Sequence, residues 1–120
     1  AGAATSTKLA INLILGLNRV ALAEGLVFAE RLGLDKASFL KIARDSAAYS
    51  QIMDVKGDKM VAADYTPVSK VSQHLKDVRI MLDEAGRRGQ PLALASALAD
   101  ILEGCMRHGE GDDLVVLRAP

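Results

Sequence analysis

Cysteine and aromatic residues are scarce in this chain of 120 residues, which has one cysteine, Cys105, and 3% aromatic side chains. A single cysteine excludes an internal disulfide. Because Cys105 lies in a stretch with helical apolar spacing, we expect a buried thiol and a reducing, cytoplasmic compartment. A surplus of charge is also absent, since 15 basic and 15 acidic residues cancel. Without a positive field that attracts phosphates, a nucleic-acid partner is not expected.

Long apolar runs are missing as well. The longest candidate, residues 9–17, is interrupted by Asn12 and Gly16 and falls short of the roughly 20 residues that a membrane span needs. No basic segment followed by an apolar one marks a leader peptide. We therefore expect no membrane partner. The first seven residues are small and begin without Met, which favours a chain shortened from a longer protein.

Strand patterns are absent, because β-branched residues do not gather into alternating runs, whereas Ala and Leu are abundant. The sequence therefore predicts an all-α fold. Half of the residues are hydrophobic, which is enough for a core without disulfide or metal. No repeat or flexible linker divides the chain. We expect residues 1–120 to form a single helical domain, a bundle built on a long N-terminal helix.

The predicted first helix is capped by Thr5 or Ser6, continues through Val27 and stops at Gly33. Its middle is apolar on nearly all sides. A helix of this kind must be surrounded by protein, and 120 residues offer few neighbours to cover it. A second copy of the chain is the natural cover, so we expect a homo-oligomer, a dimer or tetramer formed through the helical domain.

Four further helical segments are expected after Gly33. Asp35 caps a short helix with Phe39, Ile42 and Ala43 on its inner face, and a turn at 45–50 leads into another short helix that ends near 57–60. After a break at 64–67, the second long helix ends at 87–89 and has these inward positions: Val71, Leu75, Val78, Leu82 and Ala85. The next helix starts at Pro91 and ends at His108 and Gly109, with these inward positions: Leu94, Ala97, Leu98, Ile101, Leu102 and Cys105. A last short helix is expected at 112–117.

Polar residues follow one face of the first helix at the positions Lys8, Asn12, Gly16 and Arg19. The spacing alone favours a solvated stripe. His74 and His108 have no carboxylate or thiolate pattern around them that forms a ligand set, so no metal site is expected. For His108 we favour a role at a helix C-terminus.

Several motifs in order along the chain resemble the β-hydroxyacid dehydrogenase family, which includes 3-hydroxyisobutyrate dehydrogenases and tartronate semialdehyde reductases. The family pattern G-x-G-x-x-x-K-x-x-x-N is matched by Gly2, Ala4, Lys8 and Asn12, and residues 23–35 read A-E-G-L-V-F-A-E-R-L-G-L-D. The likeness continues with K-D-V at 76–78, close to the family's K-D-L, and extends to the following positions: Met60, Tyr65, Pro67, Gly89, Pro91, Gly109, Gly111 and Asp113. It implies the fold of the C-terminal domain of 6-phosphogluconate dehydrogenase-like proteins.

The resemblance also implies an NAD- or NADP-dependent enzyme that acts on a small 3-hydroxy acid. Lys8 would be the catalytic general acid/base, Asn12 and Gly2 would bind substrate, and Lys76 would contact the cofactor. A helix N-terminus and apolar enclosure would suit Lys8 because both disfavour the ammonium form. Without the resemblance, Lys76 is typical of a solvated surface lysine.

The sequence departs from the family pattern at two places and lacks one element. Ala4 replaces a usual glycine, which puts the shape of the substrate loop in doubt, and Val115 with Val116 replaces a common Ser-Ala. The G-x-G-x-x-G fingerprint of a Rossmann domain is missing, so the N-terminal nucleotide-binding domain lies outside this chain. We therefore expect the chain alone to be inactive.

Two alternatives remain open. In one, the fold persists as a non-catalytic helical oligomerisation module; in the other, it serves imine reduction. Relatives of both kinds usually carry a different residue at the position of Lys8, so this lysine favours hydroxyacid chemistry.

Overall fold

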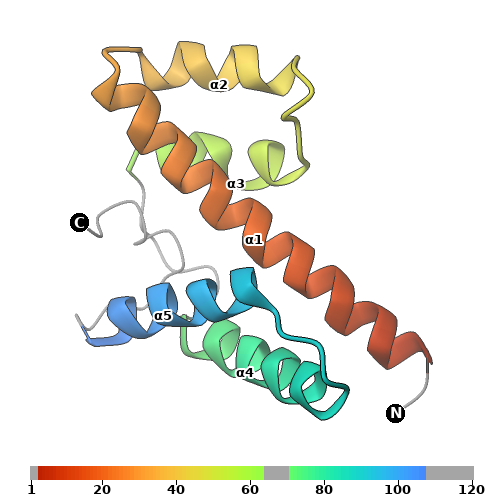
Figure 1. Cartoon of the computed structure of the whole chain (residues 1–120). Helices are drawn as coiled ribbons and strands as arrows, with labels where there is room; N and C mark the ends of the chain where they lie inside the picture. Colours follow the sequence, from red (N-terminus) through yellow and green to blue (C-terminus); the bar gives the residue numbers. More distant parts are fainter. Residues whose placement is uncertain (1–2, 64–70, 108–120) are drawn as a thin grey trace.

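The computed structural model describes residues 3–63 and 71–107, which form five helices and no strand (Figure 1). The all-α prediction, with a long N-terminal helix, is confirmed. The helix expected at 112–117 and the C-terminal role expected for His108 lie outside the described residues. The helices are α1 (Ala3–Arg31), α2 (Lys36–Arg44), α3 (Ile52–Val61), α4 (Val71–Arg87) and α5 (Ala93–Arg107).

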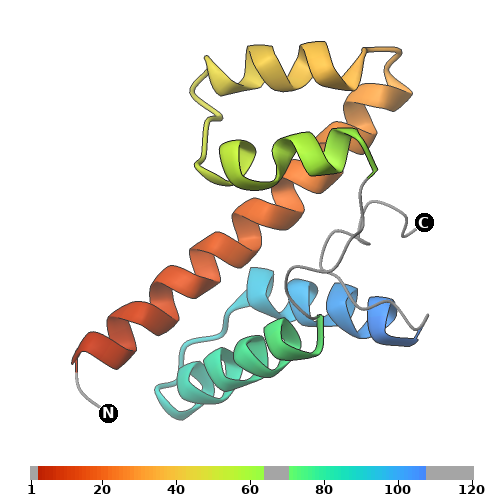
Figure 2. The ribbon, with the colours of Figure 1, turned by 180° about the vertical axis from the view of Figure 1, so that it is seen from behind.

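Two hydrophobic clusters share α1 as a common wall. Figures 1 and 2 show α1 crossing the molecule, with α2 and α3 against its C-terminal part and α4 and α5 near its N-terminal part. Leu22, Ala23 and Leu26 of α1 are buried among residues of α2 and α3. The earlier positions Leu9 and Leu13 pack against the α4–α5 cluster. The core is therefore two helix pairs joined by one helix.

The start of α1 differs from the prediction, and its end agrees. Because the helix begins at Ala3, Thr5 and Ser6 lie inside it and do not cap it. Two alanines with high helix propensity come before them, which favours the earlier start. At the other end, Gly33 adopts a φ of 89°, and the Leu34 amide donates to the Ala29 carbonyl over 3.0 Å. This arrangement is a Schellman motif, which needs a left-handed residue and so favours glycine.

Helix α2 is capped as expected, but it turns a different face inward. The Asp35 carboxylate accepts a hydrogen bond from the Ser38 amide at 3.0 Å. Leu40 and Ala43 are buried, and Phe39 packs at the edge of the cluster. The prediction for Ile42 was wrong, since 70% of its side chain is exposed. The helix is short, and the position of α3 decides which side it buries.

Arg44 fastens α2 to α3. Its Nη2 donates to the Met53 carbonyl at 3.1 Å, and its guanidinium lies 3.3 Å from Asp54 Oδ1 and 3.5 Å from Asp58 Oδ1. Tyr49 donates a hydrogen bond to Asp54, and this bond raises the pKa of the tyrosine. These polar contacts join α2 and the turn after it to α3, beside the hydrophobic cluster that the two helices share.

Helices α4 and α5 form an antiparallel pair. Gly89 ends the connection from α4 with a φ of 71°, as its position after the paired arginines predicted. Pro91 lies two residues before α5, which begins at Ala93, so Pro91 is outside the helix rather than at its first position. Arg79 of α4 pairs with Glu103 of α5 at 3.1 Å.

The inner face of α5 was only partly predicted. Leu98, Leu102 and Cys105 are buried as expected, but Leu94 and Ala97 are exposed. The buried face instead includes Ala95 and Ala99, and in α4 it includes Met81 where Leu82 was expected. Leu82 packs at the edge of the same cluster. The helical spacing of the buried residues was predicted correctly. Which side of each helix faces inward depends on where the neighbouring helix lies.

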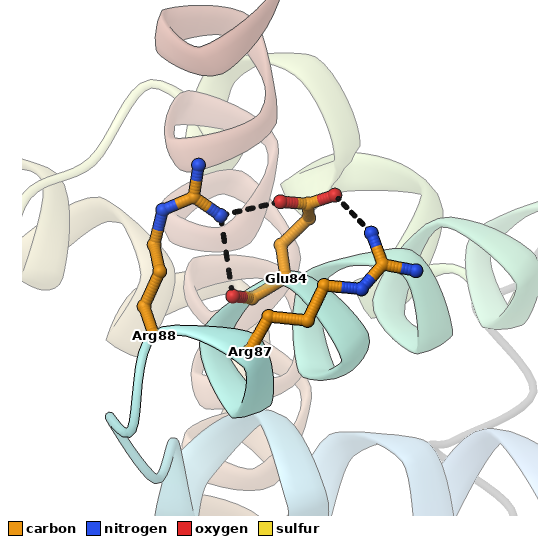
Figure 3. Close-up of polar contacts among 3 residues, drawn as sticks. All are labelled: Glu84, Arg87 and Arg88. Atoms are coloured by element: carbon orange, nitrogen blue, oxygen red, sulfur yellow. Dashed lines mark hydrogen bonds and ion pairs between the residues drawn. The ribbon is translucent and has the colours of Figure 1, made fainter.

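The C-terminal turn of α4 carries a small ion-pair group, drawn in Figure 3. Glu84 lies 3.2 Å from the Arg87 guanidinium and also pairs with Arg88, which donates to the Glu84 backbone carbonyl at 3.4 Å. Cations at this end of a helix complement its dipole. Since all three side chains are exposed, the pairs contribute little to stability.

By length and composition alone, α1 could cross a membrane. The sequence prediction considered only uninterrupted apolar runs, whereas α1 is apolar enough on average although polar residues interrupt it. Only 22% of its most apolar window is buried inside the chain. Much of the apolar surface of α1 is therefore not covered by α2 to α5.

Replacing Gly57 with alanine tests the close packing of α2 on α3. A Cβ at Gly57 would lie 2.8 Å from Leu40 Cδ2, and Leu40 is only 2% exposed, so its side chain has little room to move. Overpacking of this kind costs about 1–3 kcal/mol, partly offset by a gain of about 1 kcal/mol in helix propensity. We expect Gly57→Ala to lower the free energy of unfolding in urea titrations. Gly86→Ala is the control, since nothing lies within 4 Å of its new Cβ; equal stability of the two variants would contradict this packing.

The Asp35 cap predicts a pH dependence of stability. Hydrogen bonds from the Ser38 amide and hydroxyl hold the pKa of Asp35 below its usual 3.8. A lowered pKa means that the stabilisation is complete above pH 3.8 and is lost as the pH falls through the folded-state pKa. Asp35→Ala should therefore lower Tm at pH 7, and the difference from the wild type should shrink in acid. Asp35→Asn, which can still cap, should lose less at pH 7, and a Tm difference that stays constant with pH would refute the cap.

Candidate active site

Helix α1 carries a polar stripe in which Lys8, Asn12, Gly16 and Arg19 follow one another at helical spacing. Lys8 is exposed, Asn12 and Arg19 are half-buried, and Gly16 is buried. The stripe therefore starts in solvent and continues into the junction of α1 with α4 and α5. The prediction that these residues share a face agrees with their positions on one regular helix.

A pocket of about 140 Å³ lies where this stripe meets α4 and α5. Both polar and apolar groups form its walls. The apolar part comes mostly from residues of the α4–α5 cluster, which are held in place by close packing. The lining residues are the polar Asn12, Arg19, His74 and Asp77, and the apolar Leu15, Gly16, Val78, Met81, Leu98 and Leu102.

Gly16 allows the close approach of α5 to α1. A Cβ at this position would lie 3.2 Å from Leu98 Cδ2, tighter than ordinary van der Waals contact. Leu98 can therefore pack against the backbone of α1 at the back of the pocket. The missing side chain therefore sets how closely α5 approaches α1 beside the pocket.

Helix α4 supplies polar groups to the opposite wall. His74, Asp77, Val78 and Met81 share a face because they follow one another at helical spacing. Gln73 donates a hydrogen bond to Asp77 Oδ1 at 3.4 Å. The pocket thus combines a guanidinium, an imidazole, a carboxylate and a carboxamide, a set that can bind and orient a small polar molecule.

The structure brings together only part of the predicted site. Asn12 lines the pocket, and Lys8 lies one turn before it on the same face, exposed and outside the lining. The apolar enclosure expected around Lys8 is not formed by the described residues. Lys76 is exposed on α4, next to Asp77 but outside the pocket. Gly2 lies outside the described residues.

Sequence reasoning did not place His74 and Asp77 in a pocket, although their helical spacing with Val78 and Met81 could have shown that they share a face. Within residues 3–63 and 71–107, no three His, Cys, Asp or Glu side chains are grouped to hold a metal ion. The absence of a metal site stays a prediction.

The model of a protein family described as "NAD-binding of NADP-dependent 3-hydroxyisobutyrate dehydrogenase" matches residues 2–117. Among curated proteins, the chain is similar to "Probable 3-hydroxyisobutyrate dehydrogenase-like 1, mitochondrial" of Arabidopsis thaliana, with 33% identity over 105 residues, covering 88% of this chain and 31% of the relative. It is also similar to "Cytokine-like nuclear factor N-PAC" of Aedes aegypti, with 27% identity over 110 residues, covering 92% of this chain and 20% of that protein.

Among solved structures, the chain is similar to 3-hydroxyisobutyrate dehydrogenase from Salmonella typhimurium, with a TM-score of 0.91 and 28% identity. The match covers 98% of this chain and 42% of that one. This chain therefore spans less than half the length of the proteins that it matches. The helices of this chain have the fold of one part of the Salmonella typhimurium protein.

Proposed function

This chain belongs to the family described as the NAD-binding part of NADP-dependent 3-hydroxyisobutyrate dehydrogenases, and we propose that it is the helical C-terminal domain of an NAD- or NADP-dependent oxidoreductase. The enzyme would interconvert a small 3-hydroxy acid and its semialdehyde or keto form. The observation that carries this proposal is the polar face of α1, on which Lys8 lies one turn from pocket-lining Asn12. A nucleotide-binding Rossmann domain would precede the chain in the complete enzyme.

Lys8 would serve as the general acid/base. In the direction of oxidation, its neutral amine accepts the proton of the substrate hydroxyl; in reduction, its ammonium donates a proton to the carbonyl oxygen. Because Lys8 is exposed among the described residues, it is open to a substrate that arrives from outside the helical domain. The enclosure that excludes water around it would come from the preceding domain.

Asn12 would hold the substrate beside Lys8. Its carboxamide both donates and accepts hydrogen bonds, and it is half-buried at the edge of the pocket. Arg19 and Asp77 on the pocket walls offer charges of opposite sign for polar substituents. The small volume suits a small acid, and Gly2 would add backbone contacts to its carboxylate.

The cofactor fits this chain only in part. When bound, the nicotinamide supplies or accepts the hydride. Lys76 presents an exposed ammonium one residue before pocket-lining Asp77, so it could approach a polar group at that end of the cofactor. The described residues contain no strand and therefore no Rossmann unit. Binding of the rest of the dinucleotide is assigned to the preceding domain.

Three further parts of the proposal concern the surroundings of the enzyme. We assign a homo-oligomer, a dimer or tetramer, on the ground that α1 leaves apolar side chains exposed. We assign a cytoplasmic location because the one cysteine is a buried thiol outside any disulfide. Nucleic acid and membrane are not among the proposed partners, since the formal charge of the chain is balanced and α1 packs on both helix pairs.

The alternative is a non-catalytic oligomerisation module. It gains weight from the similarity to a protein that is named a nuclear factor and not a dehydrogenase. In such a module Lys8 would be one exposed lysine among others. The presence of a lysine one turn before Asn12 favours the enzyme, and the two hypotheses differ in what happens when this lysine is removed.

Replacing Lys8 with alanine in the full-length protein should lower kcat for a 3-hydroxy acid by about 10² to 10⁴, the usual contribution of a general acid/base. The assay follows NADH or NADPH formation with a panel of small 3-hydroxy acids. Lys41→Ala, which removes an exposed lysine from α2, is the matched control and should leave kcat unchanged. Equal turnover by Lys8→Ala and the wild type would remove the assigned role, and no turnover by the wild type would favour the module.

The chain of 120 residues alone should show no turnover with the same substrates and either cofactor. The reason is that the described helices provide Lys8, Asn12 and Lys76 but no strand from which a Rossmann nucleotide-binding unit could be built. Circular dichroism would first establish that the chain is folded. Turnover above that of Lys8→Ala in the same chain would contradict the proposal that the cofactor is bound mainly by a preceding domain.

A further inference from the structure

The pocket between α1, α4 and α5 has two parts that differ in burial and in polarity. The pocket rim is half-buried or exposed, and it consists of Asn12, Leu15, Arg19, His74 and Asp77. The pocket floor is buried and apolar, and it consists of Gly16, Val78, Met81, Leu98 and Leu102. The four floor side chains are at most 5% exposed and belong to the α4–α5 cluster. The floor is therefore a part of the hydrophobic core that the pocket reaches.

An apolar floor below a polar rim suits a ligand that has both kinds of group. The rim side chains can hydrogen-bond to the carboxylate and the hydroxyl of a 3-hydroxy acid. None of the described floor side chains donates a hydrogen bond, and only the weakly accepting sulfur of Met81 can accept one. A polar group at the floor would lose its water without gaining an equal partner. An alkyl group placed there is instead favoured, because its apolar surface leaves water.

We propose that the pocket floor holds an alkyl branch of the substrate, and that Gly16 and Met81 are the residues that set the length of branch accepted. The proposal rests on the oxidoreductase function and narrows its substrates to 3-hydroxy acids with an alkyl branch, in preference to those with a hydroxylated one. Lys8 would meet the reacting hydroxyl, and Asn12 would hold the acid at the rim. The branch would then extend along α1 toward Gly16, which lies about 6 Å beyond Asn12 at roughly 1.5 Å per residue.

The size of the pocket sets the length of the branch. A methyl group is about the size of a water molecule, which takes up roughly 30 Å³ in the liquid. The pocket has about 140 Å³, and the acid itself occupies the part near the rim. A single methyl group would leave apolar space unfilled at the floor, and unfilled space loses van der Waals contacts. A branch of about two or three carbons fills the floor better.

Gly16 and Met81 limit the floor in different ways. A Cβ at Gly16 would lie 3.2 Å from Leu98 Cδ2. Within residues 3–63 and 71–107, no second atom outside the adjoining turns of α1 comes within 4 Å of that Cβ. A methyl group at this position would therefore take up space in the pocket. Met81 has a flexible, unbranched side chain that can adjust to the length of the branch. Gly16 is thus the fixed limit of the floor, and Met81 the adjustable one.

Matched substrates test the floor in the full-length enzyme with NAD or NADP. The acids 2-ethyl-3-hydroxypropanoate and 3-hydroxy-2-(hydroxymethyl)propanoate are of equal size and differ by a methyl in place of a hydroxyl group. For a branch on the reacting carbon, the same comparison is made with 3-hydroxypentanoate and 3,4-dihydroxybutanoate. We expect kcat/KM to be at least about tenfold higher for the alkyl acid in one of the two pairs.

The two possible failures can be told apart. If the hydroxylated acid is turned over equally well or better in both pairs, the alkyl floor is overturned while the oxidoreductase function stands. If neither these acids nor the unbranched 3-hydroxypropanoate is turned over, the oxidoreductase function fails and the alkyl floor fails with it.

Replacing Gly16 with alanine tests the limit on branch length. The readout is the ratio of kcat/KM for a propyl-branched acid to that for its methyl-branched counterpart, because a loss of folded enzyme lowers both values equally and leaves the ratio unchanged. Gly16→Ala should lower this ratio at least about tenfold, since one methylene in an apolar pocket changes kcat/KM by about 10- to 200-fold. Gly25→Ala is the matched control on the same helix, because its Cβ would have nothing within 4 Å and Gly25 lies outside the lining.

Met81→Ala makes the opposite change, because it enlarges the floor, and it should raise the same ratio. Circular dichroism shows whether each variant is folded. If Gly16→Ala does not fold, Met81→Ala and the matched substrates decide. A ratio that neither variant changes, or that Gly25→Ala changes as much as Gly16→Ala, would overturn the role assigned to Gly16 and Met81.

Discussion

The packing of α1 against two separate hydrophobic clusters is the constraint on which the rest of the structure depends. Each helix pair, α2 with α3 and α4 with α5, is too small to enclose its apolar side chains, and α1 closes both. Leu26 is fully buried in one cluster, while Leu13 packs at the edge of the other. The pocket lies where α1 meets α4 and α5, and Gly16 lets Leu98 of α5 pack close to α1 there. Fold and candidate site thus share one set of contacts.

Local signals in the sequence predicted where α1 and α4 end and where α2 begins, but not where α1 and α5 begin. Gly33 and Gly89 were identified as stops, and both adopt the positive φ that glycine tolerates. Asp35 was identified as a cap because its carboxylate can reach an amide three residues on. The inward faces of the short helices were harder, as Ile42 and Leu94 show. Either side of such a helix carries apolar residues, and only the position of a neighbour distant in sequence decides which one is buried.

The candidate site, like the fold, could be predicted from the sequence only in part. That Lys8 and Asn12 share a face follows from helical spacing alone, whereas their proposed roles rest on a resemblance to enzymes and not on that spacing. The meeting of Asn12 with His74 and Asp77 could not be predicted, because it depends on the packing of α1 against α4. The exposure of Lys8 has a similar cause: the groups expected to enclose it do not come from the described helices.

The composition of α1 follows from the number of surfaces that it must serve. One side packs into the two clusters, another carries the polar stripe, and a third leaves large apolar side chains exposed: Ile11, Ile14 and Phe28. Asn18 and Arg19 are neighbours in sequence, yet Arg19 lines the pocket and Asn18 does not. Few positions are left for charge, and α1 is therefore as apolar as a membrane span, which it also matches in length. The high apolar content of α1 therefore reflects both its packing against α2 to α5 and the apolar side chains that it leaves exposed.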